Sequence, residues 1–266
     1  MPTAISVVTL LTDFGTRDYF VASMKGVILG INPQARIVDL SHDIAPQQIE
    51  DAAYVLKSAY SYFPDGTIHV AVVDPGVGSA RRSLLVTTSR YLFLAPDNGI
   101  LSDIYRDELS VEIRQLENRQ YRLDSEGSTF DGRDVFAPAA GWLTRGQPPG
   151  SFGRLIRDAV TLPAHEPTWR DHALVGHIVY IDRFGNLISN LAPSHIKEVQ
   201  GVSKGAGLTI RVGGVTINGL AHCYADGSLN APHALINSNG HLEIFLKDGS
   251  AADMMKAGRD AAVELS

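Results

Sequence analysis

Cysteine is nearly absent from this sequence: among 266 residues, Cys223 is the single example. One thiol cannot form an internal disulfide, which is typical of proteins in a reducing cytosol, so we expect a cytoplasmic location. Long apolar runs are also missing, because no stretch approaches the roughly 20 residues that a membrane-spanning helix needs. The N-terminal segment has no basic region or cleavage site of a signal peptide. These absences argue against a secreted disulfide scaffold and a membrane protein.

Positive charge is scarce as well. The sequence has 23 lysines and arginines against 29 acidic residues, a net charge of −6, so nucleic acid is not an expected partner. There is no HExxH or GxSxG motif and no Cys/His pair at metal-ligand spacing, so we expect neither a metal site nor a cofactor. Cys223 has no basic neighbour, and we expect a buried, unreactive thiol.

The first half of the sequence alternates strand and helix patterns. Apolar and β-branched runs predict strands at 6–11, 37–40, 68–73, 84–88 and 91–95, and helical spacing predicts helices at 19–31, 46–62 and 134–144. Strand–helix–strand repetition predicts right-handed crossovers onto a mostly parallel sheet.

The second half follows a proline-rich stretch from 146 to 172, and the helical period disappears beyond it. Short strands separated by glycine-rich turns are predicted at 177–181, 208–211, 215–217, 234–236, 242–245 and 262–265. The predicted fold is therefore an N-terminal, mostly parallel α/β sandwich domain (1–165) with a smaller C-terminal antiparallel β-barrel domain (172–266).

Polar clusters follow several predicted strands, at the edge where α/β sheets bind ligands. Asp13 could accept hydrogen bonds from a ribose diol or stabilise a turn, and Asp18 could contact a ligand or cap the next helix. The glycine-rich segment 74–82 brings Asp74 and Arg81 close in sequence, either to face a ligand or to pin the loop.

Two further clusters allow both a structural and a functional interpretation. In the segment 128–134, Ser128 and Asp134 are predicted helix caps, whereas Asp131 and Arg133 precede the cap and could point at a ligand. In the second half, the segments 182–186 and 238–240 are typical of turns in β domains.

Taken together, these segments resemble one family. The matching motifs are LTDFG (11–15), YFVASMKG (19–26), DLSH (39–42), FPDGT (63–67), VVDPGVG (72–78), APDNG (95–99), TFDGRDVFAP (129–138) and IDRFGNLISN (181–190). The chain is similar to the S-adenosylmethionine hydroxide adenosyltransferases, which share a fold with the fluorinase and chlorinase enzymes. The resemblance implies hydrolysis of S-adenosyl-L-methionine to adenosine and methionine, and a homotrimer with active sites at subunit interfaces.

The resemblance also implies roles for individual residues. Asp13 would hold the ribose hydroxyls, Asp182 the methionine ammonium and Ser238 the methionine carboxylate. Phe184 and Asn186 would help to hold the adenosine end. Further substrate-binding candidates are Asp18, Thr129 and Phe130, and the catalytic candidates are Asp74, Arg81 and Asp131. In the third catalytic position the family usually has histidine, in TFHGRD, where this chain has Asp131.

The chemistry needs a base for water. The leaving group of a sulfonium substrate departs as a neutral thioether, so no general acid is required. Free water has a pKa of about 15.7 and is a poor nucleophile unless a base takes its proton. We expect Asp74 or Asp131 to accept the water proton while Arg81 orients the pair. Two alternatives remain open: halide-dependent cleavage of the same substrate, which adjacent carboxylates would disfavour, and a binding protein that has lost turnover.

Overall fold

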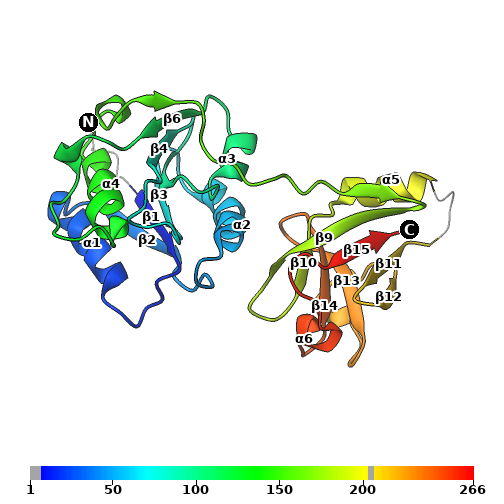
Figure 1. Cartoon of the computed structure of the whole chain (residues 1–266). Helices are drawn as coiled ribbons and strands as arrows, with labels where there is room; N and C mark the ends of the chain where they lie inside the picture. Colours follow the sequence, from blue (N-terminus) through cyan, green and yellow to red (C-terminus); the bar gives the residue numbers. More distant parts are fainter. Residues whose placement is uncertain (1–6, 203–206) are drawn as a thin grey trace. The chain divides into compact units, whose positions relative to one another are not determined.

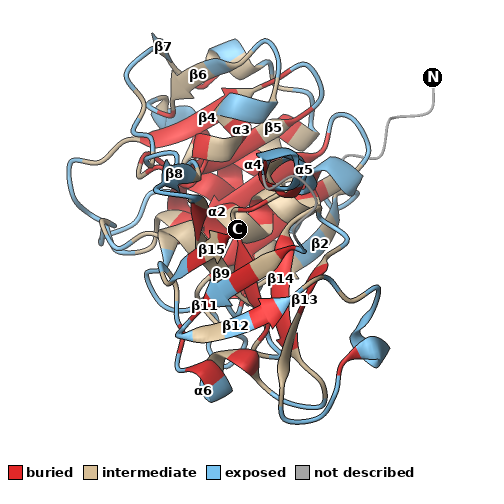
Figure 2. Ribbon diagram, turned by 90° about the vertical axis from the view of Figure 1, so that its right-hand side faces the viewer, coloured by how far each residue is buried: buried red, intermediate tan, exposed pale blue. Residues whose placement is uncertain are grey.

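The computed structural model describes residues 7–202 and 207–266 and divides into two compact units, one ending at Leu162 and the other starting at Pro163 (Figure 1). The sequence predicted a first domain ending at residue 165 and a second beginning at residue 172. Each unit has its own buried cluster of apolar side chains, seen as red segments in Figure 2. The two units are therefore described separately.

The first unit is built on one sheet with the strand order β2-β1-β3-β5-β4-β6-β7. Its strands are β1 (Val7–Thr12), β2 (Arg36–Ser41), β3 (Ile68–Val72), β4 (Ser83–Thr87), β5 (Leu92–Pro96), β6 (Glu112–Gln115) and β7 (Leu155–Ile156). Its helical segments are α1 (Phe20–Ile31), α2 (Ile49–Ala59), η1 (Tyr60–Tyr62), α3 (Ser102–Asp107), η2 (Arg119–Tyr121), η3 (Gly132–Phe136), α4 (Ala137–Thr144) and η4 (Pro149–Ser151).

Helices cover both faces of this sheet. Successive strand residues point to opposite faces, so Leu10 packs in the cluster beneath α1 and α4 while Leu11 packs in the cluster beneath α2. Figure 1 shows α1 and α4 on one side of β1 and β3, with α2 on the other. The predicted α/β sandwich is confirmed.

Only part of the sheet is parallel. Strands β2, β1, β3 and β5 run parallel, whereas β4, β6 and β7 pair antiparallel. The predicted helix over 46–62 is α2 followed by the 3₁₀ turn η1, and the predicted helix over 134–144 begins earlier, as the π-helical turn η3.

The second unit is an antiparallel barrel that is nearly closed. The strand order is β12-β11-β15-β9-β10-β14-β13, with β8 pairing to β9, and the end strands β12 and β13 approach each other. Its strands are β8 (Thr168–Arg170), β9 (Ala173–Ile181), β10 (Leu187–Ser189), β11 (Thr209–Val212), β12 (Val215–Asn218), β13 (Pro232–Ile236), β14 (Leu242–Leu246) and β15 (Ala262–Leu265). This confirms the predicted β-barrel.

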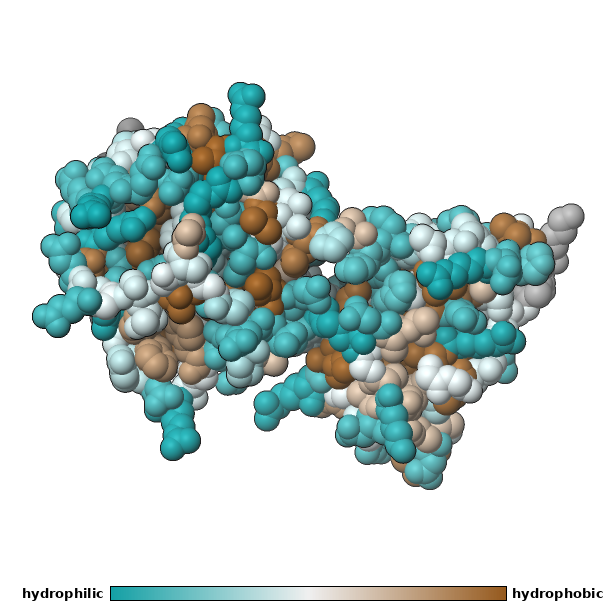
Figure 3. All heavy atoms as spheres, viewed as in Figure 1, coloured by the Kyte–Doolittle hydropathy of each residue, from teal (hydrophilic) through white to brown (hydrophobic). Residues whose placement is uncertain are grey.

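The expectation that this half contains no helix was wrong. Two helices, α5 (Pro193–Val202) and α6 (Ala251–Met255), and the 3₁₀ turn η5 (Tyr224–Asp226) connect its strands. Hydrophilic side chains cover most of the face drawn in Figure 3, with apolar groups in separate small patches. Among the residues described, no helix is long and apolar enough to cross a membrane.

Candidate active site

The polar residues of the first unit gather where β1 and β3 end. These two strands are parallel neighbours and their register pairs Thr12 with Val72. Asp13 therefore follows β1 at the same edge at which Asp74 follows β3. Since β2 lies on the other side of β1, the chain leaves β1 and β3 in opposite directions, which is the topological switch point where α/β sheets bind ligands.

The three predicted catalytic residues are in direct contact. The Nε of Arg81 donates to Asp74 Oδ1 at 2.8 Å, and its Nη2 lies against Asp74 Oδ2 and against Asp131 Oδ2. The Nη1 of the same guanidinium donates to the Ser83 hydroxyl at 2.9 Å. One arginine thus bridges two carboxylates, and its carbon lies 5.9 Å from the centre of the Phe136 ring.

The two carboxylates differ in exposure and in how many of their oxygens contact Arg81. The Asp74 side chain is 5% exposed and both its oxygens face Arg81, whereas the Asp131 side chain is 21% exposed and meets Arg81 through one oxygen. An oxygen that is not engaged by a guanidinium can accept a proton from a ligand more readily. Of the pair, Asp131 is therefore better placed to act as a base.

A second cation lies near Asp131. Burial lowers the pKa of Arg122, and the charge of Arg81 lowers it further, while the charge of Asp131 raises it. The Nη2 of Arg122 donates to the Leu116 carbonyl. Sequence analysis missed Arg122 because no motif surrounds it, and only the fold brings it toward the cluster.

Close backbone packing brings the two catalytic segments together. Gly78, with a φ of +79°, lies against Ser128, so that a Cβ atom would be 2.9 Å from the Ser128 carbonyl oxygen. Gly132 follows Asp131 and begins the π-helical turn η3, and a Cβ atom there would lie 3.2 Å from the sulfur of Met24. π-Helical turns often occur at functional sites.

The loop that carries Asp13 is held by a chain of polar groups that runs from the buried side chains of Thr12 and His42 to the surface. His42, which is 6% exposed, shares a hydrogen bond of 2.8 Å between its Nδ1 and Thr12 Oγ1, and its Nε2 lies 3.0 Å from Asp39. Lys25 donates to the same Asp39 carboxylate at 2.6 Å. The Oδ2 of Asp13 accepts the backbone N–H of Gln47 at 2.8 Å, which fixes its orientation. His42 ends the motif 39–42, and the structure shows that its ring supports the end of β1.

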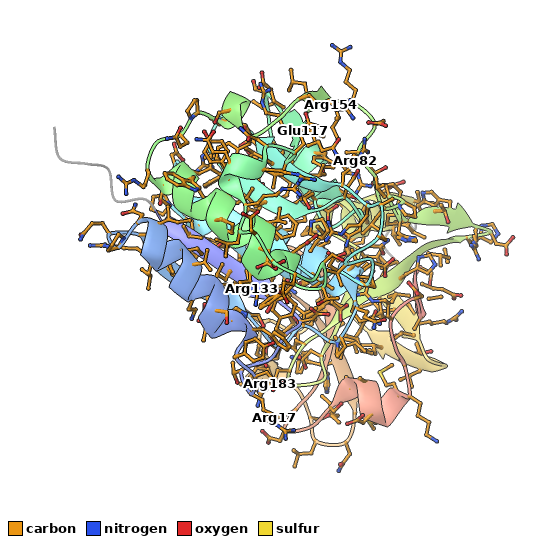
Figure 4. All side chains as sticks on the ribbon, turned by 60° about the vertical axis from the view of Figure 1, so that its left-hand side comes forward. Arg17, Arg82, Glu117, Arg133, Arg154 and Arg183 are labelled. Atoms are coloured by element: carbon orange, nitrogen blue, oxygen red, sulfur yellow. The ribbon has the colours of Figure 1, made fainter. Side chains whose placement is uncertain are left out.

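Hydrogen bonds also hold the loop 74–82 at Arg82, where it ends, and at Val73, just before it begins. The Nε of Arg82 donates to Asp97 Oδ2 at 2.7 Å and its Nη1 to Asp158 at 2.7 Å (Arg82 is labelled in Figure 4). Asn98 donates from Nδ2 to the Val73 carbonyl at 2.8 Å, next to Asp74. Asn98 lies in one of the matching motifs, but nothing in the sequence showed that it supports Asp74.

Phe130 belongs to a cluster of aromatic rings. Its ring packs edge-on against Phe20 at 5.2 Å and Phe14 at 5.9 Å, and Arg133 lies 5.0 Å above it. Figure 4 shows Arg133 at the start of the segment that leads into α4. Its neighbour Thr129 precedes Phe130 in the same loop.

Ser128 and Asp134 are not helix caps, although both were predicted as such, and Asp18 does not take its alternative role as a cap. Ser128 precedes the N-cap of η3 by three residues. Asp18 is exposed, and the N-cap of α1 is Tyr19, which makes no side-chain capping bond. Asp134 lies inside η3 rather than before it, is buried, and pairs with Arg133 through two hydrogen bonds of 2.6 and 2.9 Å. Asp131 takes the N-cap position of η3, also without a side-chain capping bond.

In the second unit, Asp182 organises the turn between β9 and β10. Its Oδ1 accepts the backbone N–H groups of Phe184 and Asn186, both at 2.9 Å, and its Oδ2 accepts from Asn186 Nδ2 at 2.9 Å. Gly185, with a φ of +80°, completes the turn and its carbonyl accepts from Ala252 at the start of α6. The predicted turn role of Asp182 is therefore real, and it leaves the Phe184 ring 76% exposed.

This turn forms one wall of a cavity of about 660 Å³ within the barrel unit. The cavity is lined by Asp182, Phe184, Asn186, Tyr224, Ala225, Phe245 and the segment 246–249. The rings of Tyr224 and Phe245 stand edge-to-face, with centroids 5.1 Å apart and an interplanar angle of 86°. Aromatic walls with a few polar groups suit a flat heteroaromatic ligand.

Ser238 is not among the lining residues of this cavity and lies in the turn between β13 and β14. Cys223 is exposed, so the expectation of a buried thiol was wrong, because it lies in a loop at the N-cap of η5. Within the described ranges, no three His, Cys, Asp or Glu side chains cluster in a way that could hold a metal ion.

An acidic site at the switch point of an α/β unit, followed in the chain by a barrel with an aromatic cavity, defines a class of proteins that bind small molecules. Family comparison identifies the class further. The model of the SAM hydroxide adenosyltransferase N-terminal domain matches residues 8–153, and that of the C-terminal domain matches residues 176–264. The chain belongs to this family, as its motifs indicated.

Individual relatives agree with this assignment. A protein of Thermus thermophilus named (R)-S-adenosyl-L-methionine hydrolase is 33% identical, over 93% of this chain and 94% of its own length. One of the same name from Methanocaldococcus jannaschii is 36% identical over 72% of this chain and 69% of its own length. A fluorinase of Nocardia brasiliensis is 26% identical over 97% of both chains. A crystal structure of an uncharacterized conserved protein from Thermotoga maritima aligns with a TM-score of 0.88, at 30% identity, over 97% of this chain and 99% of that one.

Proposed function

We propose that this protein hydrolyses S-adenosyl-L-methionine to adenosine and L-methionine. The observation that carries the proposal is the Asp74–Arg81–Asp131 cluster at the ends of β1 and β3, in a chain of this family. The hydrolase-named relatives match most of the chain and support the same reaction. Fluorinases are less similar, at 24–26% identity.

In this reaction the water oxygen forms a bond to the ribose 5′ carbon as the bond from that carbon to sulfur breaks. The bonding electrons pass to sulfur, which becomes a neutral thioether, and the water proton passes to a carboxylate. Asp131 is the proposed proton acceptor, because Arg81 engages only one of its oxygens. Arg81 and Asp74 would hold Asp131 in place, and a positioned base of this kind contributes about 10²–10⁴-fold in rate.

Substrate contacts follow the family pattern. Asp13 would bind the ribose hydroxyls, consistent with its fixed orientation beside Gln47. Phe184 and Asn186 would hold adenine in the aromatic cavity, with Asp182 at the methionine ammonium. Ser238 would receive the methionine carboxylate. Asp18, Thr129 and Phe130 remain proposed contacts.

The decisive experiment incubates purified protein with S-adenosylmethionine, with and without chloride, and separates the products by chromatography. Equal amounts of adenosine with and without chloride, together with methionine, are expected. A chlorinated nucleoside that appears only with chloride would replace hydrolysis with halide transfer. Binding without any product would leave a ligand-binding protein and refute the hydrolase.

We also propose that the protein is a cytoplasmic homotrimer that uses no cofactor. The trimer is what resemblance to the family implies, and the reducing location is consistent with the single cysteine. Light scattering coupled to gel filtration tests the trimer directly, since a monomer of 28.7 kDa and a trimer are well separated.

A further inference from the structure

A buried carboxylate, Glu243 on β14, connects the 3₁₀ turn η5 with the turn between β13 and β14. Glu243 is 3% exposed. The Tyr224 hydroxyl donates to its Oε1 at 2.7 Å, and Asn237 donates from Nδ2 to its Oε2 at 3.1 Å. A buried carboxylate is costly unless its oxygens accept hydrogen bonds, and here each oxygen has a donor.

The first partner, Tyr224, is a wall of the aromatic cavity. Half of this residue is exposed, so its ring could swing toward solvent if nothing held the hydroxyl end. The bond to Glu243 and the edge-to-face contact with Phe245 fix the ring at both ends. Burial raises the pKa of the Tyr224 hydroxyl, and the bond to Glu243 raises it further, so the hydroxyl remains a donor at neutral pH.

The second partner, Asn237, closes the turn that contains Ser238. Its Oδ1 accepts the backbone N–H groups of Asn239 and His241, both at 3.0 Å. Its backbone carbonyl accepts from Gly240 at 3.0 Å. Since Asn237 Oδ1 is occupied by the turn, its Nδ2 is free to reach Glu243, which ties the whole turn to β14.

We propose that Glu243 is a positioning residue that sets the spacing between the two substrate-binding parts of the barrel. It holds the Tyr224 ring against the adenine and holds the Asn237–Gly240 turn so that Ser238 meets the methionine carboxylate. This inference rests on the proposed function, which assigns those two substrate ends. It makes Glu243 a determinant of specificity for ligands that carry both a purine and an amino-acid end.

The test compares three variants. Glu243→Leu removes both acceptors at similar size. Glu243→Gln can keep both contacts, because its carbonyl accepts from Asn237 and its amide donates to the Tyr224 hydroxyl oxygen. Tyr224→Phe keeps the ring and removes only the hydroxyl that donates to Glu243. Tyr91→Phe is the matched control, since Tyr91 also donates from a hydroxyl, to the Ser61 and Phe63 carbonyls, but lies in the first unit.

The measurements are KM and kcat for S-adenosylmethionine and the dissociation constants of adenosine and of methionine by calorimetry. Glu243→Leu is expected to raise KM about tenfold or more and to weaken the binding of both adenosine and methionine, because Tyr224 and Asn237 both lose their acceptor. The value of kcat is expected to change less than about threefold, since these contacts bind substrate and transition state alike. Glu243→Gln should recover most of the loss, and Tyr224→Phe should weaken adenosine but not methionine.

An unchanged KM in Glu243→Leu overturns the inference, as does a Glu243→Gln variant as impaired as Glu243→Leu. Should Glu243→Leu fail to fold, Tyr224→Phe decides: adenosine affinity equal to that of Tyr91→Phe overturns the inference. Failure of the proposed function is recognised separately. A wild-type protein that binds adenosine but does not hydrolyse S-adenosylmethionine refutes the hydrolase, while the adenosine measurements still test Glu243.

Discussion

Asp131 stands where the family resemblance leads us to expect a histidine, and in the proposed reaction the aspartate would take the proton from water. A histidine in this position would be neutral and basic only above its pKa of about 6.5, whereas an aspartate is ionised above about 4. In the structure Arg81 contacts Asp131 directly and Arg122 lies near enough to feel its charge.

Substitution of Asp131 tests this role. Asp131→Asn is expected to lower kcat by about 10²–10⁴-fold with little change in KM, because it removes the base without removing a substrate contact. Asp131→His should restore activity, with the acid limb of the kcat profile moved up toward pH of about 6.5. Steady-state rates between pH 4 and 9 give the answer, with Asp124→Asn, an exposed residue of the same loop, as the control. A fully active Asp131→Asn would assign the proton to another group.

At the residue scale, the sequence predicted which side chains of the candidate site lie together where those residues belong to a recognisable segment. Asp74 and Arg81 lie in one glycine-rich segment, 74–82, and Asp131 lies in the motif 129–138, and the structure brings all three into contact. Their catalytic role stays a prediction. Arg122 and Glu243 were missed, since their partners lie on segments that only folding brings near them. A charged residue outside a motif has no sequence signal for a buried role.

Pairing of β1 with β3 places two polar side chains inside the sheet. Thr9 and His69 are register partners, both fully buried, joined by a hydrogen bond of 2.8 Å. The His69 ring also stacks on Phe93, with centroids 5.1 Å apart. Burial lowers the pKa of His69 to about 3, so the ring is neutral in the folded protein.

This pair predicts a pH dependence of stability. Below the unfolded pKa of about 6.5 the unfolded chain takes up a proton at this site that the folded chain refuses, so stability falls as pH drops from about 6.5 toward 3. His69→Phe removes the titration and keeps the stacking. Urea unfolding at pH 7 and pH 4.5 should show a stability difference smaller than that of the wild type by about 2–3 kcal/mol. An identical difference in both proteins would mean that His69 does not titrate on unfolding.

The turn between β9 and β10 depends on one glycine. A side chain at Gly185 would meet Ser250, whose Cα would lie 3.0 Å from the added Cβ, and the φ of +80° disfavours any other residue. Gly185→Ala should therefore shift the turn, weaken adenosine binding about tenfold or more and lower the melting temperature. Gly146→Ala, which also has positive φ but open space, is the control for backbone strain alone. Equal adenosine affinity in the two variants would contradict the packing argument.

At the scale of elements, long apolar patterns were predictive and weak ones were not. Helix α1 and strand β3 were predicted within a residue or two because their apolar residues follow one period. Helix α5 was missed, since only Ile196 and Val199 of its residues are buried. The antiparallel direction of β4 could not be read from the sequence, because a buried strand has the same apolar pattern in either direction.

At the scale of the whole molecule, we expect the proposed reaction to need no metal or cofactor. A sulfonium carries its own activation, so extensive dialysis against a chelator should leave kcat within about twofold of the untreated value, well below the 10²-fold or greater loss that removal of a catalytic group produces. Rates measured before and after dialysis, with added Mg²⁺ and Zn²⁺ as separate controls, decide this. Activity that disappears and returns with one metal would require a metal-dependent mechanism instead.

The position of the one cysteine has a practical consequence. Cys223 is exposed and adjoins Tyr224, a wall of the aromatic cavity, so a thiol-reactive fluorophore attached there would report ligand entry by a change in emission. No other thiol competes for the label, and no cysteine has to be engineered in or out. The natural sequence is thus ready for a real-time optical binding assay, in which adenosine and methionine can be titrated without waiting for turnover.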